Sequence, residues 1–264
     1  MATDSFIHLA RHYDRHAAVA AETGQRLIER LDGLRFEPQI ILELGCATGQ
    51  RLRALRNRFE HARIIGIDRS GAMLTKARRQ RGWWRPRFDL LQGDLLNLPL
   101  AADSVEMVYA NLTLSWAGEL PKALLEMRRI LKPNGLVLVS MLGPDTLGGS
   151  ALRDFLLPRS LVDVQALGSE LVRAGFSEPV LDTDWLTTSH SSLQSLTSEL
   201  VGASLLRAGD REQQFKADSS GSTTAQWEIV SASAWAPAPG QPVRGLHGDE
   251  VSIPVENIGR RQQS

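Results

Sequence analysis

The sequence has little cysteine, no net charge and no long apolar run, and each absence excludes a class of protein. Of the 264 residues only Cys46 is a cysteine, which excludes an internal disulfide framework and a cysteine-rich zinc site. The 30 lysines and arginines balance 30 aspartates and glutamates, whereas a general nucleic-acid-binding protein usually carries a basic excess. The longest mostly apolar run, 136–142, is too short to span a bilayer. We therefore expect neither a nucleic-acid nor a membrane partner.

The remaining composition is that of an ordinary globular protein. Hydrophobic residues make up 42% of the chain and charged residues 23%, and the length suits one large domain or two small ones. The N-terminus mixes Asp4, His8, Arg11 and Asp14 and contains no apolar signal-peptide core. These features predict a soluble cytoplasmic protein, and an enzyme.

Apolar runs alternate with amphipathic stretches between residues 39 and 141. This alternation predicts βαβ units, a mostly parallel sheet and helices on both of its faces. The predicted strands are 39–44, 63–68, 88–92, 105–110 and 136–141, and the predicted helices are 49–59, 70–79 and 120–131. Ligands of such sheets bind at the carboxyl ends of the strands.

The two ends of the chain have a different character. A helical pattern over 6–31 predicts an N-terminal helical cap, 1–38, ahead of a main domain, 39–264. Beyond Leu142 the pattern predicts helices at 161–174 and 192–206 and strands at 180–188 and 227–235. Residues 207–226 are polar and predict a loop, and the tail after 236 is predicted to be extended, with a short strand at 251–255.

The segment Glu43-Leu-Gly-Cys-Ala-Thr-Gly49 lies between a predicted strand and a predicted helix. Gly45 and Gly49 allow the backbone to turn sharply and a ligand to approach it. Alone, this motif suits a dinucleotide, a phosphate or other ligands, or a tight turn without a ligand. Two further acids, Asp68 and Asp94, follow the next two strands, so three acids point to one crevice. Unless they are ordinary loop carboxylates, they repel a phosphate-rich ligand and favour a cation that carries ribose and adenine.

This arrangement resembles the class I S-adenosylmethionine-dependent methyltransferases, whose first motif is an acid followed by alternating glycines. The resemblance implies a Rossmann-like, mostly parallel seven-stranded sheet, and S-adenosylmethionine as cofactor. It also implies cofactor-binding roles along the strand ends. The implied residues are Glu43 as the acid of the first motif, Gly45 and Gly49 for the methionine part, Asp68 for the ribose, Asp94 and Leu95 for the adenine, and Asn111 closing the site. Ala47 departs from the family, which usually has a glycine there.

A narrower resemblance is to the malonyl-acyl-carrier-protein O-methyltransferases of biotin synthesis. The matching pieces include Tyr13-Asp-Arg-His-Ala17, Asn111-Leu-Thr-Leu-Ser-Trp116, Gly143-Pro-Asp-Thr-Leu147 and Trp227-Glu-Ile-Val230. The resemblance implies methylation of the free carboxyl of a malonyl thioester carried by acyl carrier protein. A complex I assembly factor of the same superfamily shares related pieces. An assembly or binding protein that keeps the fold, and a methyltransferase for another small acid, therefore remain alternatives.

The chain departs from this narrower family where the substrate should be covered. Ser115 replaces a glutamine, Gly148-Gly-Ser150 comes before Leu152-Arg153, and the stretch before Trp227 is shorter. Because a malonyl carboxylate, with a reference pKa of roughly 4, is already ionised at neutral pH, the reaction needs positioning and no general base. We expect Arg153 to bind the substrate carboxylate and Tyr13 to contact the substrate as well, and the resemblance places Tyr13 and His16 near the cofactor. We predict no catalytic residue.

Two further patterns concern metal binding and an acidic partner. His8, His12 and His16 are spaced by four residues, as on one helix face, but no carboxylate or cysteine completes a metal site, so we predict no metal. Residues 51–87 hold twelve lysines and arginines against two acids, Glu60 and Asp68. This basic stretch is either a solvated helical surface or a surface that steers an acidic acyl carrier protein.

Overall fold

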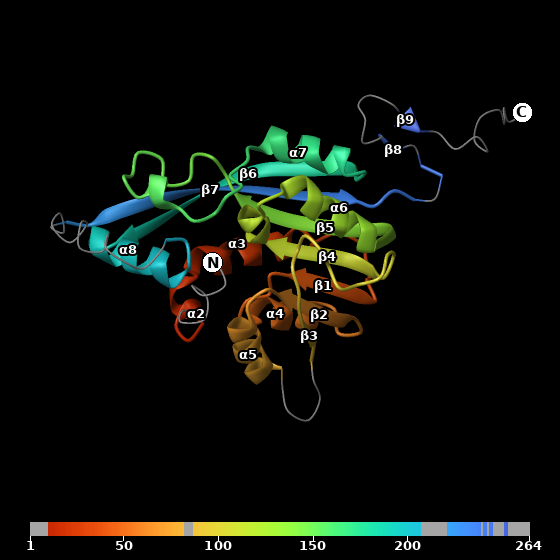
Figure 1. Ribbon diagram of the computed structural model, residues 1–264, viewed down its shortest axis with the longest axis horizontal. Coiled ribbons are helices and arrows are strands. Elements are labelled where there is room, and N and C mark those ends of the chain that lie inside the picture. The colour runs from red at the N-terminus through yellow and green to blue at the C-terminus, as the bar shows by residue number, and fades with distance from the viewer. Residues whose placement is uncertain are drawn as a thin grey trace, which may run out of the picture.

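The computed structural model describes residues 10–81, 87–206, 221–238, 240–241, 243–244 and 251–252. Its main sheet has seven strands in the order β3-β2-β1-β4-β5-β7-β6 (Figure 1). The strands are β1 (Ile40–Leu44), β2 (Arg63–Asp68), β3 (Asp89–Gln92), β4 (Val105–Asn111), β5 (Leu131–Leu142), β6 (Ser177–His190) and β7 (Thr223–Trp235). Strands β1 to β5 pair in parallel, and β7 runs antiparallel to both β5 and β6. The predicted fold class, a mostly parallel seven-stranded sheet, is confirmed.

Helices cover both faces of the sheet. They are α2 (Tyr13–His16), α3 (Ala18–Glu29), α4 (Gln50–Arg58), α5 (Gly71–Gln80), α6 (Leu120–Ile130), α7 (Val164–Arg173) and α8 (Leu193–Gly202). Short 3₁₀ helices span η1 (Thr113–Trp116) and η2 (Arg153–Phe155). In Figure 1, α2 and α8 lie at the same end of the sheet, toward the carboxyl ends of β1 and β4. No helix in the described ranges combines the length and apolarity needed to cross a membrane.

Alternate side chains of the central strands enter two separate cores because successive strand residues point to opposite faces. On one face, strand residues such as Leu42 and Val108 pack with α6 and α7. On the other face, Ile41 and Met107 pack with α3 and α4. The inner strands are thus buried on both sides, which explains their nearly continuous apolar sequences.

Strands β6 and β7 extend beyond the sheet as a two-stranded ribbon. Strand β5 pairs only with Ile229–Trp235 of β7, whereas β6 pairs with β7 down to the His190–Thr223 pair. Helix α8 packs against this ribbon, and Leu196, Leu200 and Trp227 share a third core. Ser192 caps α8 by accepting a hydrogen bond from the amide of Ser195. The ribbon and α8 together extend the molecule past the carboxyl end of β5.

Several predicted boundaries need correction. The predicted N-terminal helix is interrupted at Ala17, which separates α2 from α3, and residues 6–9 lie outside the described part of the chain. The predicted loop 207–226 is wrong at its end, because Thr223–Gln226 pair with β6 as part of β7. Residues 207–220 are not among the described residues. In the tail, β8 (Val243–Arg244) pairs with β9 (Val251–Ser252), and the remainder of the predicted strand, 253–255, is outside the described ranges.

Candidate functional site

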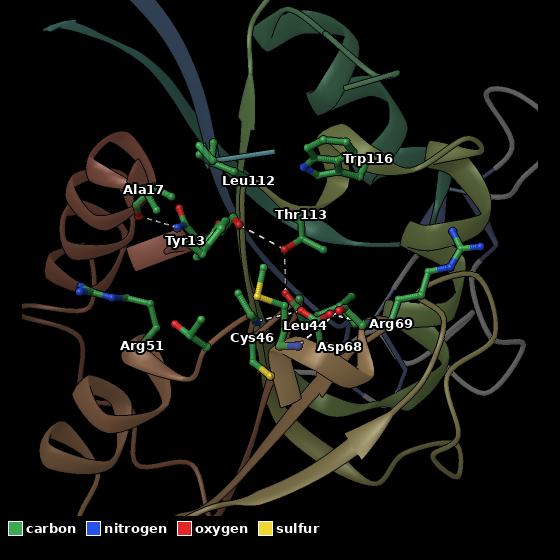
Figure 2. Close-up of a pocket in the computed structure, with 18 of the residues that line it drawn as sticks. Tyr13, Ala17, Leu44, Cys46, Arg51, Asp68, Arg69, Leu112, Thr113 and Trp116 are labelled. Carbon is green, nitrogen blue, oxygen red and sulfur yellow. Dashed lines mark hydrogen bonds between the residues drawn. The ribbon is translucent and has the colours of Figure 1, made fainter. Parts of the chain in front are cut away.

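A cavity of about 280 Å³ opens at the carboxyl ends of the strands, where the sequence pattern places a ligand (Figure 2). Seven of the predicted site residues line it together: Tyr13, Glu43, Gly45, Asp68, Asp94, Leu95 and Asn111. Gly49 and Arg153 are not among its lining residues. The cavity has two parts. The acidic half is lined mainly by residues from segments 43–51, 67–73 and 93–96, and the apolar half by His16, Val19, Leu112, Leu142, Glu199, Leu200, Leu205 and Trp227.

The glycine turn after β1 is shaped by its neighbours. Gly45 has a φ of +73°, and a Cβ there would overlap the side chain of Thr113. The hydroxyl of Thr113 donates to the carbonyl of Leu44 at 2.9 Å, which ties η1 to the turn (Figure 2). Gly49, with a φ of +84°, precedes the first residue of α4. Gly49 thus starts that helix, and its contact with the methionine part of the cofactor stays a prediction.

Ala47 occupies a left-handed backbone conformation, with a φ of +44°. This conformation is unfavourable for alanine and nearly free for glycine, because a Cβ there crowds the backbone. The backbone geometry therefore gives a physical reason for the glycine that the family usually has at this position. Ala47 keeps one functional contact, since its amide donates to Oδ2 of Asp68 at 2.8 Å.

The three acids of the acidic half are held in different ways. Asp68 accepts backbone hydrogen bonds on both oxygens, from Ala47 and, at 2.7 Å, from Ser70. Asp94 accepts one from Leu96 at 2.9 Å. Glu43 is only 4% exposed, and its Oε2 has no hydrogen-bond partner among the described residues. A buried carboxylate oxygen without a partner is costly, so this atom is well placed to meet a ligand.

Burial and mutual repulsion raise the pKa values of the groups around this turn. Burial raises the pKa of Glu43 well above its ordinary value, and Asp68 adds to the rise while Arg51 opposes it. Burial also raises the pKa of Asp68, against the lowering effect of the amides of Ser70 and Ala47. Burial, followed by the charges of Asp68, Asp14 and Glu43, raises the pKa of Tyr13 to about 12. The Tyr13 hydroxyl therefore keeps its proton at neutral pH and can act as a hydrogen-bond donor.

The N-terminal helices are fastened over the acidic half by polar contacts. Asp14 accepts a hydrogen bond from the Thr48 hydroxyl and pairs with Lys76 at 2.6 Å. Asn111 donates to the carbonyl of Ala20 at 2.8 Å, and its side-chain oxygen accepts from Ser140 at 2.9 Å. Asn111 lines the cavity and its amide group also holds α3 in place, so its predicted role of closing the cofactor site stays a prediction. The Asp14 contacts were missed because their partners lie far along the chain.

The apolar half is closed by α2 and α8. His16 packs so tightly on Gly202 that a Cβ at Gly202 would overlap the imidazole ring. Figure 2 shows Leu112 and Trp116 on the opposite side of the cavity from Cys46 and Asp68. Sequence reasoning missed Glu199 and Leu200, because no local motif marks them, and it gave Trp227 no role although the matching piece 227–230 begins there. Of the three evenly spaced histidines, His12 comes directly before α2 and His16 ends it, and His8 lies outside the described residues.

The family-specific motif Gly143-Pro-Asp-Thr-Leu147 is a turn fastened to β7. Glu228 is buried and its Oε2 accepts from the amide of Asp145 at 2.7 Å. A Cβ at Gly143 would overlap the Glu228 side chain, so this glycine makes room for the carboxylate. Beyond the turn, Leu152 is fully buried in the third core and Arg153 begins η2. Arg153 is thus half-buried outside the cavity wall, and its role toward a substrate stays a prediction.

Ser115, which replaces the family glutamine, has a clear structural role. It is fully buried, and its hydroxyl accepts a hydrogen bond from the amide of Leu142 at 2.8 Å. Its carbonyl accepts from the amides of Arg159 and Ser160. Ser115 therefore joins η1 to the end of β5 and to the segment before α7.

The acidic half fits S-adenosylmethionine. A sulfonium cation suits the unpartnered Oε2 of Glu43, because an opposite charge stabilises the ionised carboxylate. Asp68 ends β2, the position at which a nucleotide-binding sheet holds a ribose hydroxyl. Gly45 leaves the backbone open to a ligand at the turn between them. These observations are independent of any relative.

Comparison with known proteins agrees with this fit. The profile of the family described as "Methyltransferase domain" matches residues 42–139. An S-adenosylmethionine-dependent methyltransferase of Thermotoga maritima superposes with a TM-score of 0.60 at 18% identity, covering 89% of this chain and 100% of that one. Phosphoethanolamine N-methyltransferase 2 of Haemonchus contortus, in complex with S-adenosylmethionine, gives 0.60 at 16% identity over 86% of this chain and 56% of that one. Fold and site together define a class I methyltransferase with S-adenosylmethionine as cofactor.

Two relatives in sequence narrow the assignment. A malonyl-[acyl-carrier protein] O-methyltransferase of Xylella fastidiosa is 33% identical, with 98% of this chain and 95% of the relative aligned. One of Gallionella capsiferriformans is 32% identical over 89% of this chain and 90% of the relative. The chain belongs to the malonyl-[acyl-carrier protein] O-methyltransferase family.

Proposed function

We propose that the protein transfers the methyl group of S-adenosylmethionine to the free carboxyl of a malonyl thioester on acyl carrier protein, in the pimeloyl part of biotin synthesis. The observation that carries the proposal is one continuous cavity with two unlike halves. The acidic half suits a cationic cofactor, and the apolar half suits an uncharged chain. The names of the relatives supply the substrate class.

In this proposal the cofactor is held by the acidic half. Glu43 and Gly45 contact the methionine part, Asp68 the ribose, and Asp94 with Leu95 the adenine. Gly49 shapes the turn, and Asn111 acts by holding α3 over the site. When bound, the cofactor supplies an electrophilic methyl group on a sulfonium. The protein aligns that methyl with the carboxylate and excludes water through α2 and α8.

The substrate carboxylate needs no base, because carboxyl groups with reference pKa values of about 4 are ionised at neutral pH. It does need a hydrogen-bond donor. Tyr13 lines the cavity and has a pKa of about 12, so it keeps its proton and can donate a hydrogen bond to the carboxylate. We assign substrate positioning first to Tyr13. Arg153 remains a second candidate that would have to approach from outside the wall.

The predicted partner is acyl carrier protein, and the predicted compartment is the cytoplasm. Exposed arginines of the basic stretch include Arg53 on α4 and Arg78 and Arg79 on α5. These side chains suit an acidic protein, whose approach they would accelerate through long-range attraction. Arg58 and Arg63 contribute less, because they already pair with Asp32 and Asp89.

The direct test is methyl transfer from labelled S-adenosylmethionine to malonyl-acyl carrier protein. We expect transfer to the malonyl carboxyl, and rescue of a biotin-requiring strain that lacks this step. Binding of the cofactor without transfer to this substrate, even at high enzyme concentration, would reject the proposal and favour an assembly or binding protein. Transfer only to a different carboxylic acid in a panel of free and carrier-bound acids would favour the remaining alternative.

A further inference from the structure

Glu199 places a carboxylate in the otherwise mostly apolar half of the cavity. It lies on α8 and lines the cavity, and its side chain is 25% exposed. Its Oε2 lies 3.6 Å from Nδ1 of His190, a buried residue at the end of β6. The proposed reaction assigns no part to either side chain.

A row of polar groups lies behind Glu199. The indole N–H of Trp227 donates to the hydroxyl of Thr188 at 3.1 Å, and that hydroxyl lies 2.8 Å from Nε2 of His190. Because Nε2 of His190 faces Thr188, the other ring nitrogen, Nδ1, faces Glu199. One side of the carboxylate therefore faces the buried imidazole ring, and the other side meets the cavity.

Only a hydrogen-bond donor or a cation can satisfy the exposed side of this carboxylate. The arginines that line the cavity among the described residues are Arg51 and Arg69, and both belong to the acidic half. Figure 2 shows them on either side of Cys46 and Asp68, the part of the cavity opposite Leu112 and Trp116. No arginine among the described residues therefore pairs with Glu199 from the apolar half, and a ligand there can offer the carboxylate a donor of its own.

This inference rests on the proposed function. The substrate of that function carries hydrogen-bond donors in one part only. Its malonyl carboxylate is ionised and only accepts, and its thioester carbonyl also only accepts. The phosphopantetheine arm, in contrast, carries amide N–H groups beside apolar dimethyl and methylene groups. We propose that Glu199 accepts a hydrogen bond from an amide N–H of this arm. Because Glu199 also repels a carboxylate, it directs the malonyl end away from itself and toward the sulfonium.

The test is the binding of S-methyl pantetheine, an arm without an acyl group, to the full chain in the presence of S-adenosylhomocysteine. Glu199→Ala should weaken this binding about tenfold, the loss expected for one hydrogen bond to a charged group. Glu199→Gln should weaken it less, because its amide oxygen still accepts a hydrogen bond. Glu170→Gln removes the same charge from α7, where Glu170 contacts Arg173, and should leave binding unchanged. Dissociation constants for S-adenosylhomocysteine check that each variant keeps its cofactor site.

The outcomes separate this inference from the proposed function. Equal binding of S-methyl pantetheine by the wild type and Glu199→Ala, or no binding by the wild type, would overturn the role of Glu199. So would an equal loss of S-adenosylhomocysteine affinity in Glu199→Ala, which would indicate a general structural role. The proposed function is decided separately, by methyl transfer from wild-type protein to malonyl-acyl carrier protein.

Discussion

The two halves of the cavity are built from different kinds of structure. In the acidic half, each important side chain lies within a few residues of a strand end, and the strands β1, β2 and β3 are parallel neighbours. In the apolar half, the walls come from α2, the end of β5, α8 and the β6–β7 ribbon, which are far apart along the chain. The acidic half is formed by local turns on a common sheet edge. The apolar half exists only once the ribbon and α8 are packed.

This difference explains where the chain departs from its family. The departures at Ser115, 148–150 and 207–220 fall around the apolar half or outside the described residues, whereas Ala47 is the single departure noted in the acidic half. A cofactor has one shape in every member of a class, so its binding turns tolerate little change. The substrate half can vary as long as its packing contacts are replaced, as the Ser115–Leu142 hydrogen bond illustrates.

The largest expected effect is a loss of cofactor affinity from a change in the acidic half alone. Asp68→Asn removes a charge and leaves one of two backbone amides, those of Ala47 and Ser70, without its acceptor. We expect affinity for S-adenosylmethionine to fall about 30- to 100-fold, the equivalent of about 2–3 kcal/mol for interactions with a charged group. Isothermal titration calorimetry measures the change. Unchanged affinity would remove Asp68 from the cofactor site.

The next largest effect is a loss of stability from a change in the packing around the apolar half. In Gly143→Ala, the new methyl group displaces Glu228 from its hydrogen bond with Asp145. We expect a loss of about 1–3 kcal/mol in the free energy of unfolding, as for overpacked buried sites. Cofactor affinity of the folded protein should change by less than about twofold, since the two sites do not share contacts. Gly71→Ala is the matched control, because its Cβ would meet Gln92 at an ordinary 3.6 Å. Denaturant unfolding compares the two variants.

A third prediction concerns the pH dependence of the acidic half. Because the pKa of Glu43 is raised in the folded state, the native protein holds a proton that the unfolded chain has already lost above the ordinary value of 4.5. Stability of the cofactor-free protein should therefore fall as pH rises above the ordinary value of 4.5 and through the raised pKa of Glu43. Glu43→Gln should flatten this slope. Part of the pH dependence should remain in the variant, because the pKa of Asp68 is also raised.

Thermal unfolding across this pH range, with and without cofactor, tests the prediction. Cofactor binding should strengthen as pH rises, because the sulfonium favours ionised Glu43. Glu43→Gln should weaken binding by about tenfold and remove part of its pH dependence. An unaltered stability slope in Glu43→Gln would contradict the assignment of the raised pKa to this residue.

The smallest expected effect is a small gain in stability from a change in the turn of the acidic half. Ala47→Gly removes the strain of an alanine in a left-handed conformation but increases the conformational entropy of the unfolded chain. We therefore expect the free energy of unfolding to rise by only about 0.5 kcal/mol. The amide contact with Asp68 does not involve the side chain and should remain. Urea midpoints measure the gain, and a less stable glycine variant would show that the φ of +44° is not strained.

Much of the fold could be predicted from the sequence because its signals are local. The runs that became β1, β2, β4 and β5 are apolar on both faces, and Ser70 caps α5 at the predicted residue. The acids Glu43, Asp68 and Asp94 were predicted to converge, because parallel strands share a carboxyl edge. Their convergence in one cavity wall follows from the strand order alone.

The parts that could not be predicted depend on contacts between distant residues. Glu228 and Asp145 are 83 positions apart, and no pattern near either residue indicates the other. The same holds for Asp14 with Lys76 and for His16 with Gly202. Arg153 follows the buried Leu152 and is not among the residues that line the cavity, so its role toward a substrate stays a prediction.

The sequence by itself determined the alternation of strands and helices, and it placed an acid after each of three strands. Both depend on the spacing of apolar residues and on short turns, which a chain specifies within a few positions. Only the tertiary structure decided what faces those acids. It brought α2, α8 and the β6–β7 ribbon together over the sheet edge, with Glu199 3.6 Å from His190. Such a wall depends on packing across the whole chain, so no single segment encodes it.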